Sequence, residues 1–165
     1  RKYESQLERG FNKFRWLQYT FTSSLALIVV ALVVGVSDLT TLILIVGSVF
    51  LSGFASLMIE LNNRQNYKSR IPGFIRFVAL FTPWFVVGEY VKNTLMYGDG
   101  GFESYVYYII ASIFVLQLAT LANAKLLTNK KGKWSDYLYG EENYMILSLL
   151  ALSALTWQVY ISLLS

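Results

Sequence analysis

The sequence predicts an all-α integral membrane protein, a single membrane domain of residues 1–165 with five membrane-spanning helices. Three observations support this fold class. Charged residues make up only 15% of the chain and apolar residues 55%, whereas a soluble domain carries about a quarter charged residues. The charges gather in short clusters, as expected where hydrocarbon offers no partner for an ionised group. The basic residues also concentrate in alternate loops, the pattern that sets membrane topology.

Five stretches are long enough to cross a bilayer, which takes about 20 mostly apolar residues. The predicted spans cover residues 14–36, 39–61, 72–96, 103–127 and 136–164. Pro72 suits the first turn of the third span, whereas Pro83 inside that span is expected to kink it. Ser135 is the predicted N-cap of the fifth span. A soluble bundle of buried helices is the alternative, and five successive spans in so short a chain argue against it.

The loop charges predict the orientation of the chain in the membrane. One side collects every basic residue except Lys92, namely Arg1, Lys2, Arg9, Lys13, Arg15, Arg64, Lys68, Arg70, Arg76, Lys125, Lys130, Lys131 and Lys133. The other side has Lys92 together with Asp38, Glu89, Asp99 and Glu103. Because cytoplasmic loops are enriched in Lys and Arg, the Arg1 end is expected in the cytoplasm and Ser165 on the opposite side.

The composition argues against several function classes. The chain has neither Cys nor His, so disulfides and thiolate metal sites are ruled out and the commonest general base and metal ligand are missing. We therefore expect no enzyme, no catalytic residue and no metal site. The net charge of +4 is divided among loops, which argues against a nucleic-acid partner. The chain opens with Arg1 rather than Met, which suggests a fragment or a processed form.

Small and polar side chains inside the spans have structural interpretations. Ser48, Ser52 and Ser56 recur at helical spacing, which favours helix packing within the bundle over an oligomer interface. Glu89 and Lys92 lie near a helix end, which favours an interfacial ion pair over a proton relay.

The remaining polar side chains in the spans are neutral. Gln18, Gln117, Asn123 and Gln158 are expected to form interhelical hydrogen bonds. Trp84, beside Pro83, lies deep in the third span, where it either fills the core or lines a ligand pocket.

Two segments resemble a known family. Residues 14–24 (FRWLQYTFTSS) resemble the start of the third helix of heliorhodopsins. Residues 131–138 (KGKWSDYL) and 144–158 resemble the loop into that family's seventh helix and the helix itself. The resemblance implies a rhodopsin-like helical bundle, with five transmembrane helices of a seven-helix ancestral fold. Helices one and two of the family are then absent from this chain, and the inverted topology of the family agrees with the loop charges.

The resemblance also implies where a retinal would attach, and this chain departs from the family there. Family members form a Schiff base on a lysine of the seventh helix, where this chain has Leu152, and use a glutamate counterion in the third helix, where it has Gln18. The two losses are physically linked, because a buried carboxylate without its cation is costly. We therefore expect no cofactor, and in particular no covalent retinal.

Two functions remain open from the sequence. The first is a structural or accessory subunit, or scaffold, in a membrane assembly, with the lipid bilayer and other membrane chains or a homodimer as partners. The second is a sensory membrane protein with a non-covalent pocket for a retinoid, carotenoid or lipid. Its possible lining is Thr22, Ser23, Ser24, Trp84, Leu152, Ser153 and Trp157. A transporter or proton pump is disfavoured, because the spans show no ionisable relay.

Overall fold

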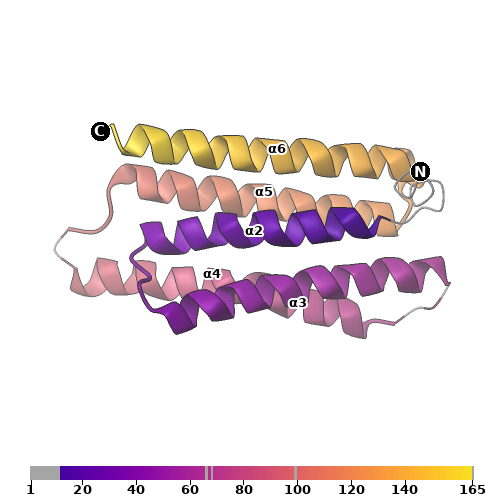
Figure 1. The fold of residues 1–165 in the computed structure, drawn as a ribbon, viewed down its shortest axis with the longest axis horizontal. Helices are drawn as coiled ribbons and strands as arrows, with labels where there is room; N and C mark the ends of the chain where they lie inside the picture. The colour runs from indigo at the N-terminus through magenta and orange to yellow at the C-terminus, as the bar shows by residue number, and fades with distance from the viewer. Residues whose placement is uncertain (1–11, 66, 68, 99, 165) are drawn as a thin grey trace.

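Five long helices make up the computed structural model, which describes residues 12–65, 67, 69–98 and 100–164 (Figure 1). The helices are α2 (Lys13–Val33), α3 (Leu39–Arg64), α4 (Ile71–Tyr97), α5 (Ser104–Thr128) and α6 (Tyr137–Ser162), with a short 3-10 helix η1 (Gly132–Ser135) before α6. Each long helix contains a segment long and apolar enough to cross a membrane. The predicted five-helix membrane bundle is confirmed. Residues Arg1, Lys2, Arg9, Lys68, Asp99 and Ser165, which entered the topology prediction, lie outside the described residues.

The first helix is shorter than predicted, because a glycine ends it. Gly35 adopts a positive φ of 88°, which favours a residue without a Cβ. The N–H of Val36 donates to the carbonyl of Ala31 at 2.9 Å, and the N–H of Gly35 donates to that of Leu32 at 3.0 Å. These two bonds form a Schellman motif, so α2 stops at Val33 and residues 34–36 belong to the connection.

The N-cap of the last helix is also one residue later than predicted. Ser135 ends the 3-10 helix η1, whereas Asp136 has an extended backbone and its side chain accepts a hydrogen bond from the N–H of Leu138 at 3.0 Å. The carboxylate therefore satisfies a free N–H at the helix start.

Asp38 caps α3 and gives this helix end a pH dependence. Its carboxylate accepts hydrogen bonds from the Thr41 hydroxyl and the Thr41 N–H, both at 2.7 Å. These bonds lower the pKa of Asp38 below its ordinary value of 3.8. The stabilisation is therefore fully present above about pH 3.8 and is lost as the pH falls through the lowered pKa. We expect Asp38→Ala to lower the thermal unfolding temperature slightly at pH 7.

The pH profile supplies the control for this cap. The gap in unfolding temperature between the wild-type protein and Asp38→Ala should close as the pH is lowered below about 3.8. Thermal unfolding followed by circular dichroism in detergent, over a series of pH values, measures the gap. A gap that stays constant across this range would contradict the assigned cap.

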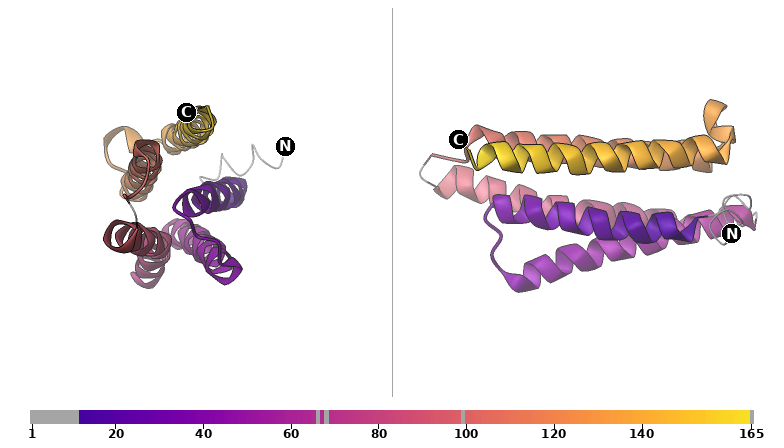
Figure 2. Two further views of the ribbon diagram at one scale, coloured as in Figure 1. Left: turned by 90° about the vertical axis from the view of Figure 1, so that its left-hand side faces the viewer. Right: turned by 45° about the horizontal axis from the view of Figure 1, so that its top comes forward.

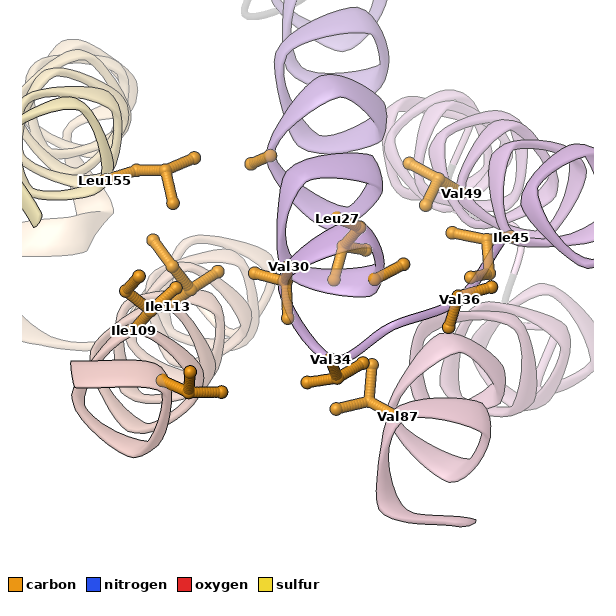
Figure 3. Close-up of a cluster of buried hydrophobic side chains, with 13 residues drawn as sticks. Leu27, Val30, Val34, Val36, Ile45, Val49, Val87, Ile109, Ile113 and Leu155 are labelled. Atoms are coloured by element: carbon orange, nitrogen blue, oxygen red, sulfur yellow. The ribbon is translucent and has the colours of Figure 1, made fainter. Parts of the chain in front are cut away.

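The helices pack in two groups. Helices α2, α3 and α4 pack closely together, and α5 packs on α6, while α2 supplies most of the contacts between the groups. The end-on view in Figure 2 shows the five helices arranged around a common centre. The buried apolar cluster joins the groups. It includes Val30 of α2 and Val34, the C-cap of α2, which lie beside Val87 of α4 and Ile109 of α5 (Figure 3). Leu155 brings α6 into the same cluster.

Small residues of α3 face the inside of the bundle, and one of them, Gly53, contacts α2. Ser52 and Ser56 are buried, and Gly53 lies directly against the side chain of Thr20. The Ser56 hydroxyl donates to the carbonyl of Ser52 at 2.8 Å, and that of Ser48 donates to the carbonyl of Ile45 at 2.7 Å. Small side chains that satisfy their hydroxyls within their own helix let the two backbones approach closely.

Three interhelical hydrogen bonds expected from the sequence are present. The Trp84 indole N–H donates to Gln117 at 2.7 Å, which joins α4 to α5. The Ser112 hydroxyl donates to Gln158 at 2.9 Å, which joins α5 to α6. The third polar residue, Asn123, donates to the carbonyl of Gly140 in α6 at 3.0 Å. No such bond to the side chain of Gln18 is described.

The ion pair expected near the end of α4 is also present. The ammonium group of Lys92 lies 2.7 Å from a carboxylate oxygen of Glu89, and both side chains are about half exposed. A pair in this setting contributes little to stability, which agrees with the interfacial interpretation.

Candidate functional site

A buried network of charged and aromatic side chains occupies one end of the bundle. We call it the Arg15 network and define it by Asn12, Arg15, Glu60, Tyr137 and Glu141. It joins the start of α2, the end of α3 and the start of α6. We call this end of the bundle, which also includes the start of α4 and the end of α5, the Arg15 end.

The start of α2 positions Arg15. Asn12 is the N-cap, and its side-chain oxygen accepts a hydrogen bond from the N–H of Arg15 at 3.1 Å. The amide nitrogen of the same side chain donates to Glu141 at 2.9 Å. Asn12 therefore caps the start of α2 and also binds Glu141 of α6. These two contacts fix the position of Arg15 beside this acid.

Glu60 receives three donors. The guanidinium Nη2 of Arg15 lies 2.5 Å from one carboxylate oxygen, and the Trp16 indole N–H donates to the same oxygen. The Tyr137 hydroxyl donates to the other oxygen at 2.7 Å. A carboxylate buried at this depth needs such partners, because desolvation without them costs several kcal/mol.

Arg15 contacts two acids and three aromatic rings, those of Trp16, Tyr137 and Tyr144. Its other terminal nitrogen forms an ion pair with Glu141. The guanidinium carbon lies 4.5 Å from the ring centroids of both Trp16 and Tyr144, a cation–π geometry. Only 8% of Arg15 and 5% of Glu141 is exposed, so the pair is screened from solvent.

The contacts of the Arg15 network have a structural role, because they join helices. Both acids have donors on each oxygen or an ion-pair partner, and a buried polar network with nearly all its groups satisfied rigidifies its surroundings. Because Arg15 and Glu60 belong to one helix group and Tyr137 and Glu141 to the other, the network fastens the two groups together. The Nε atom of Arg15 is the one donor of this residue left without a hydrogen-bond partner.

Sequence analysis did not find this network. Arg15 and Arg76 were counted among the loop charges, yet they lie within α2 and α4, and the acids Glu60 and Glu141 were overlooked. The expectation that the remaining polar side chains of the spans are neutral is therefore wrong at the Arg15 end, where Arg15, Glu60 and Glu141 lie within α2, α3 and α6. A signal was present: Glu60 falls inside the predicted second span, where an unexplained acid is a candidate functional group.

Only some of the predicted pocket residues lie together in the structure. Thr22, Ser23 and Leu152 line one cavity of about 50 Å³ between α2, α5 and α6. Ser24 is buried and donates to the carbonyl of Thr20 at 2.7 Å. Gln18, at the counterion position implied by the resemblance, lines a different cavity beside Asn12 and Glu141.

The aromatic members of the predicted pocket do not line that cavity. Trp84 packs its ring against Phe114 with centroids 4.9 Å apart and joins the edge of the apolar core. Trp157 is 64% exposed, and Ser153 is also exposed. Within the described residues, these side chains do not close one pocket around Leu152.

Comparison with known proteins identifies a family. The family model described as heliorhodopsin matches residues 1–164, nearly the whole chain. No curated protein matches it. The match covers every helix that contributes to the Arg15 network and to the cavity beside Leu152.

Proposed function

Because this chain belongs to the heliorhodopsin family, we propose that it is a retinal-free member that acts as a structural or accessory subunit in a membrane assembly. The proposal rests on one observation above all: the attachment position implied by the resemblance is Leu152, an aliphatic side chain. An imine requires a primary amine, and leucine has none. The Arg1 end is proposed to face the cytoplasm, in agreement with the loop charges.

The surroundings of Leu152 support the same proposal. The cavity that it lines with Thr22 and Ser23 measures about 50 Å³, whereas ligand sites for drug-sized molecules span about 300–1,000 Å³. Leu152 is itself 38% exposed. These residues do not fit a covalently bound retinal.

Gln18 supports it independently. Gln18 lies within a membrane-spanning helix, where a glutamate would need a cation close by, since a carboxylate in a low-dielectric site otherwise costs several kcal/mol or takes up a proton. The neutral amide removes this requirement in a chain whose seventh-helix position carries Leu152. The two changes are consistent with each other, as expected if the pair was lost together.

The scaffold role draws support from the Arg15 network. Functional relays need groups that change protonation or partner, whereas Glu60 and Glu141 are each held by donors from other helices. Such fixed contacts favour a rigid bundle that other membrane chains, or a second copy, pack against. The alternative is a sensory protein with a non-covalent apolar ligand. Thr22, Ser23 and Leu152 do line one cavity, but its volume of about 50 Å³ is small for such a ligand.

Addition of all-trans retinal tests the first part of this proposal. The purified protein is expected to gain no visible absorption band, and borohydride reduction followed by mass spectrometry should detect no retinyl adduct. Leu152→Lys combined with Gln18→Glu restores the amine and its counterion and is the matched variant. A reduced adduct on the unmodified chain, at any residue, would refute the retinal-free assignment. A band that disappears on denaturation, without an adduct, would favour the non-covalent pocket.

The scaffold role has a separate test. Membranes solubilised in mild detergent should yield the chain together with other membrane subunits, or with a second copy of itself, at a fixed ratio. Mass measurement of the intact complex gives that ratio. Recovery of the chain only as a monomer, with native helicity retained, would rule the subunit role out.

A further inference from the structure

A basic side chain lies on the inward face of α4. The buried residues Ala79, Leu80, Pro83 and Val87 mark that face, and Arg76 lies on it one turn earlier, because residues three and four apart share a helix face. Arg76 is partly buried. Within the described part of the chain, no carboxylate lies within ion-pair distance of it.

Arg76 lines the largest cavity at the Arg15 end. This cavity has a volume of about 470 Å³ and lies between the two helix groups, a size typical of small-molecule sites. Trp134, Tyr137 and Ser135 contribute aromatic and hydroxyl groups to its wall, and Lys130 contributes a second cation. Both helix groups therefore supply its lining.

Among the described residues, two of the cations that line this cavity form no ion pair. Glu60 lines it, but Arg15, Trp16 and Tyr137 all donate to that carboxylate. Arg15 is in turn committed to two acids. Arg76 and Lys130 thus present positive charge to the cavity without an acid of their own among the described residues. A partly desolvated cation without a partner is costly, and an anion in the cavity would remove that cost.

Lys130 has an unusual backbone conformation at the end of α5. Lys130 has a φ of +48°, in the left-handed region where a helix commonly ends on glycine or asparagine. Lysine pays a small conformational cost there. Lys130 is exposed and lines the cavity, so its side chain is available to an anion there.

We propose that this cavity binds a phosphate group, carried either by the headgroup of an anionic lipid or by a soluble phosphate ester. Arg76 holds the anion from the α4 side through its planar fork of donors, and Lys130 holds it from the end of α5. Basic pockets between membrane helices suit anionic headgroups. The site is separate from Leu152 and does not depend on the absence of retinal.

Soluble probes test the site on the full chain in detergent. The probes are dihexanoyl phosphatidic acid, dihexanoyl phosphatidylcholine and inorganic phosphate, and tryptophan fluorescence reports binding because Trp16 and Trp134 line the cavity. Phosphatidic acid should bind saturably and phosphatidylcholine should not. Arg76→Gln and Lys130→Gln should each weaken binding about tenfold, the loss expected for one charge-assisted contact. Lys131→Gln is the matched control, since Lys131 is exposed and does not line the cavity.

Two further comparisons separate the sources of the phosphate and the role of the backbone. Competition by inorganic phosphate would identify the phosphate itself as the recognised group and favour a soluble ester, whereas binding of phosphatidic acid without competition would favour the lipid. Lys130→Gly should unfold at the same or a higher temperature and still bind weakly. If Arg76→Gln does not fold, Arg76→Lys keeps the charge and should retain most of the binding. Equal binding of phosphatidylcholine, or equal losses in Lys130→Gln and Lys131→Gln, would overturn the proposal.

Discussion

Replacing Arg15 by methionine is expected to destabilise the protein by about 3–5 kcal/mol, the cost of leaving buried charges without their partner. Glu60 and Glu141 would both lose their cation while staying in a site where 5% of Glu141 is exposed. Methionine keeps most of the apolar volume of the arginine stem, so the loss measures charge rather than packing. Thermal unfolding in mild detergent, monitored by circular dichroism, gives the change in stability.

The half-exposed ion pair of α4 supplies a matched control. Lys92→Met breaks the contact with Glu89, where both partners are about half exposed, and should cost no more than about 1 kcal/mol. Combining Arg15→Met with Glu60→Gln and Glu141→Gln should recover much of the lost stability, because the site is then neutral. Similar losses in Arg15→Met and Lys92→Met would mean that the Arg15 network is not buried as described.

Adding one methyl group at Gly53 is expected to cost about 1–3 kcal/mol, as overpacking of a tight contact does. A Cβ there would run into the hydroxyl of Thr20 across the α2–α3 contact. The threonine is not free to turn away, since its hydroxyl donates to the carbonyl of Trp16 at 2.7 Å. The unfolding temperature of Gly53→Ala in detergent measures the cost.

The same helix provides the comparison for this substitution. A Cβ on Gly47 meets nothing within 4 Å, so Gly47→Ala should stabilise α3 by about 0.5–1 kcal/mol, the usual gain of alanine over glycine inside a helix. Adding Thr20→Ala to Gly53→Ala should restore part of the loss, because the two residues touch. If Gly53→Ala behaves like Gly47→Ala, the close approach of the helices is wrong.

The five helices could be predicted because the bilayer imposes a length and a composition on each span. The exact ends of the helices depend on the conformation and hydrogen bonds of single residues. Gly35 ends α2 early through its positive φ, and Asp136 rather than Ser135 caps α6. These features depend on a few backbone angles, whereas the apolar length of a span sums over about 20 residues. The family was recognised from short runs of residues in two segments, and the family match confirms it.

The Arg15 network could not be predicted by the same reasoning. Asn12 and Glu141 meet although they are 129 residues apart in the sequence, and no spacing along the chain reports such a contact. Arg15 also lies so close to the start of its helix that its charge is indistinguishable from a topological one. The functional importance of Leu152 and Gln18 follows from the resemblance alone and stays a prediction until retinal is tested.

The order in which the helices are made has a consequence for the Arg15 network. Arg15 and Glu60 are 45 residues apart, so a growing chain can pair them as soon as α3 enters the membrane. Glu141 and Tyr137 emerge only with α6, which follows the other four helices along the chain. Until then Glu60 is the only acid of the Arg15 network that the arginine can pair with. The second acid arrives with α6, so the network joins the two helix groups only after α6 has been made.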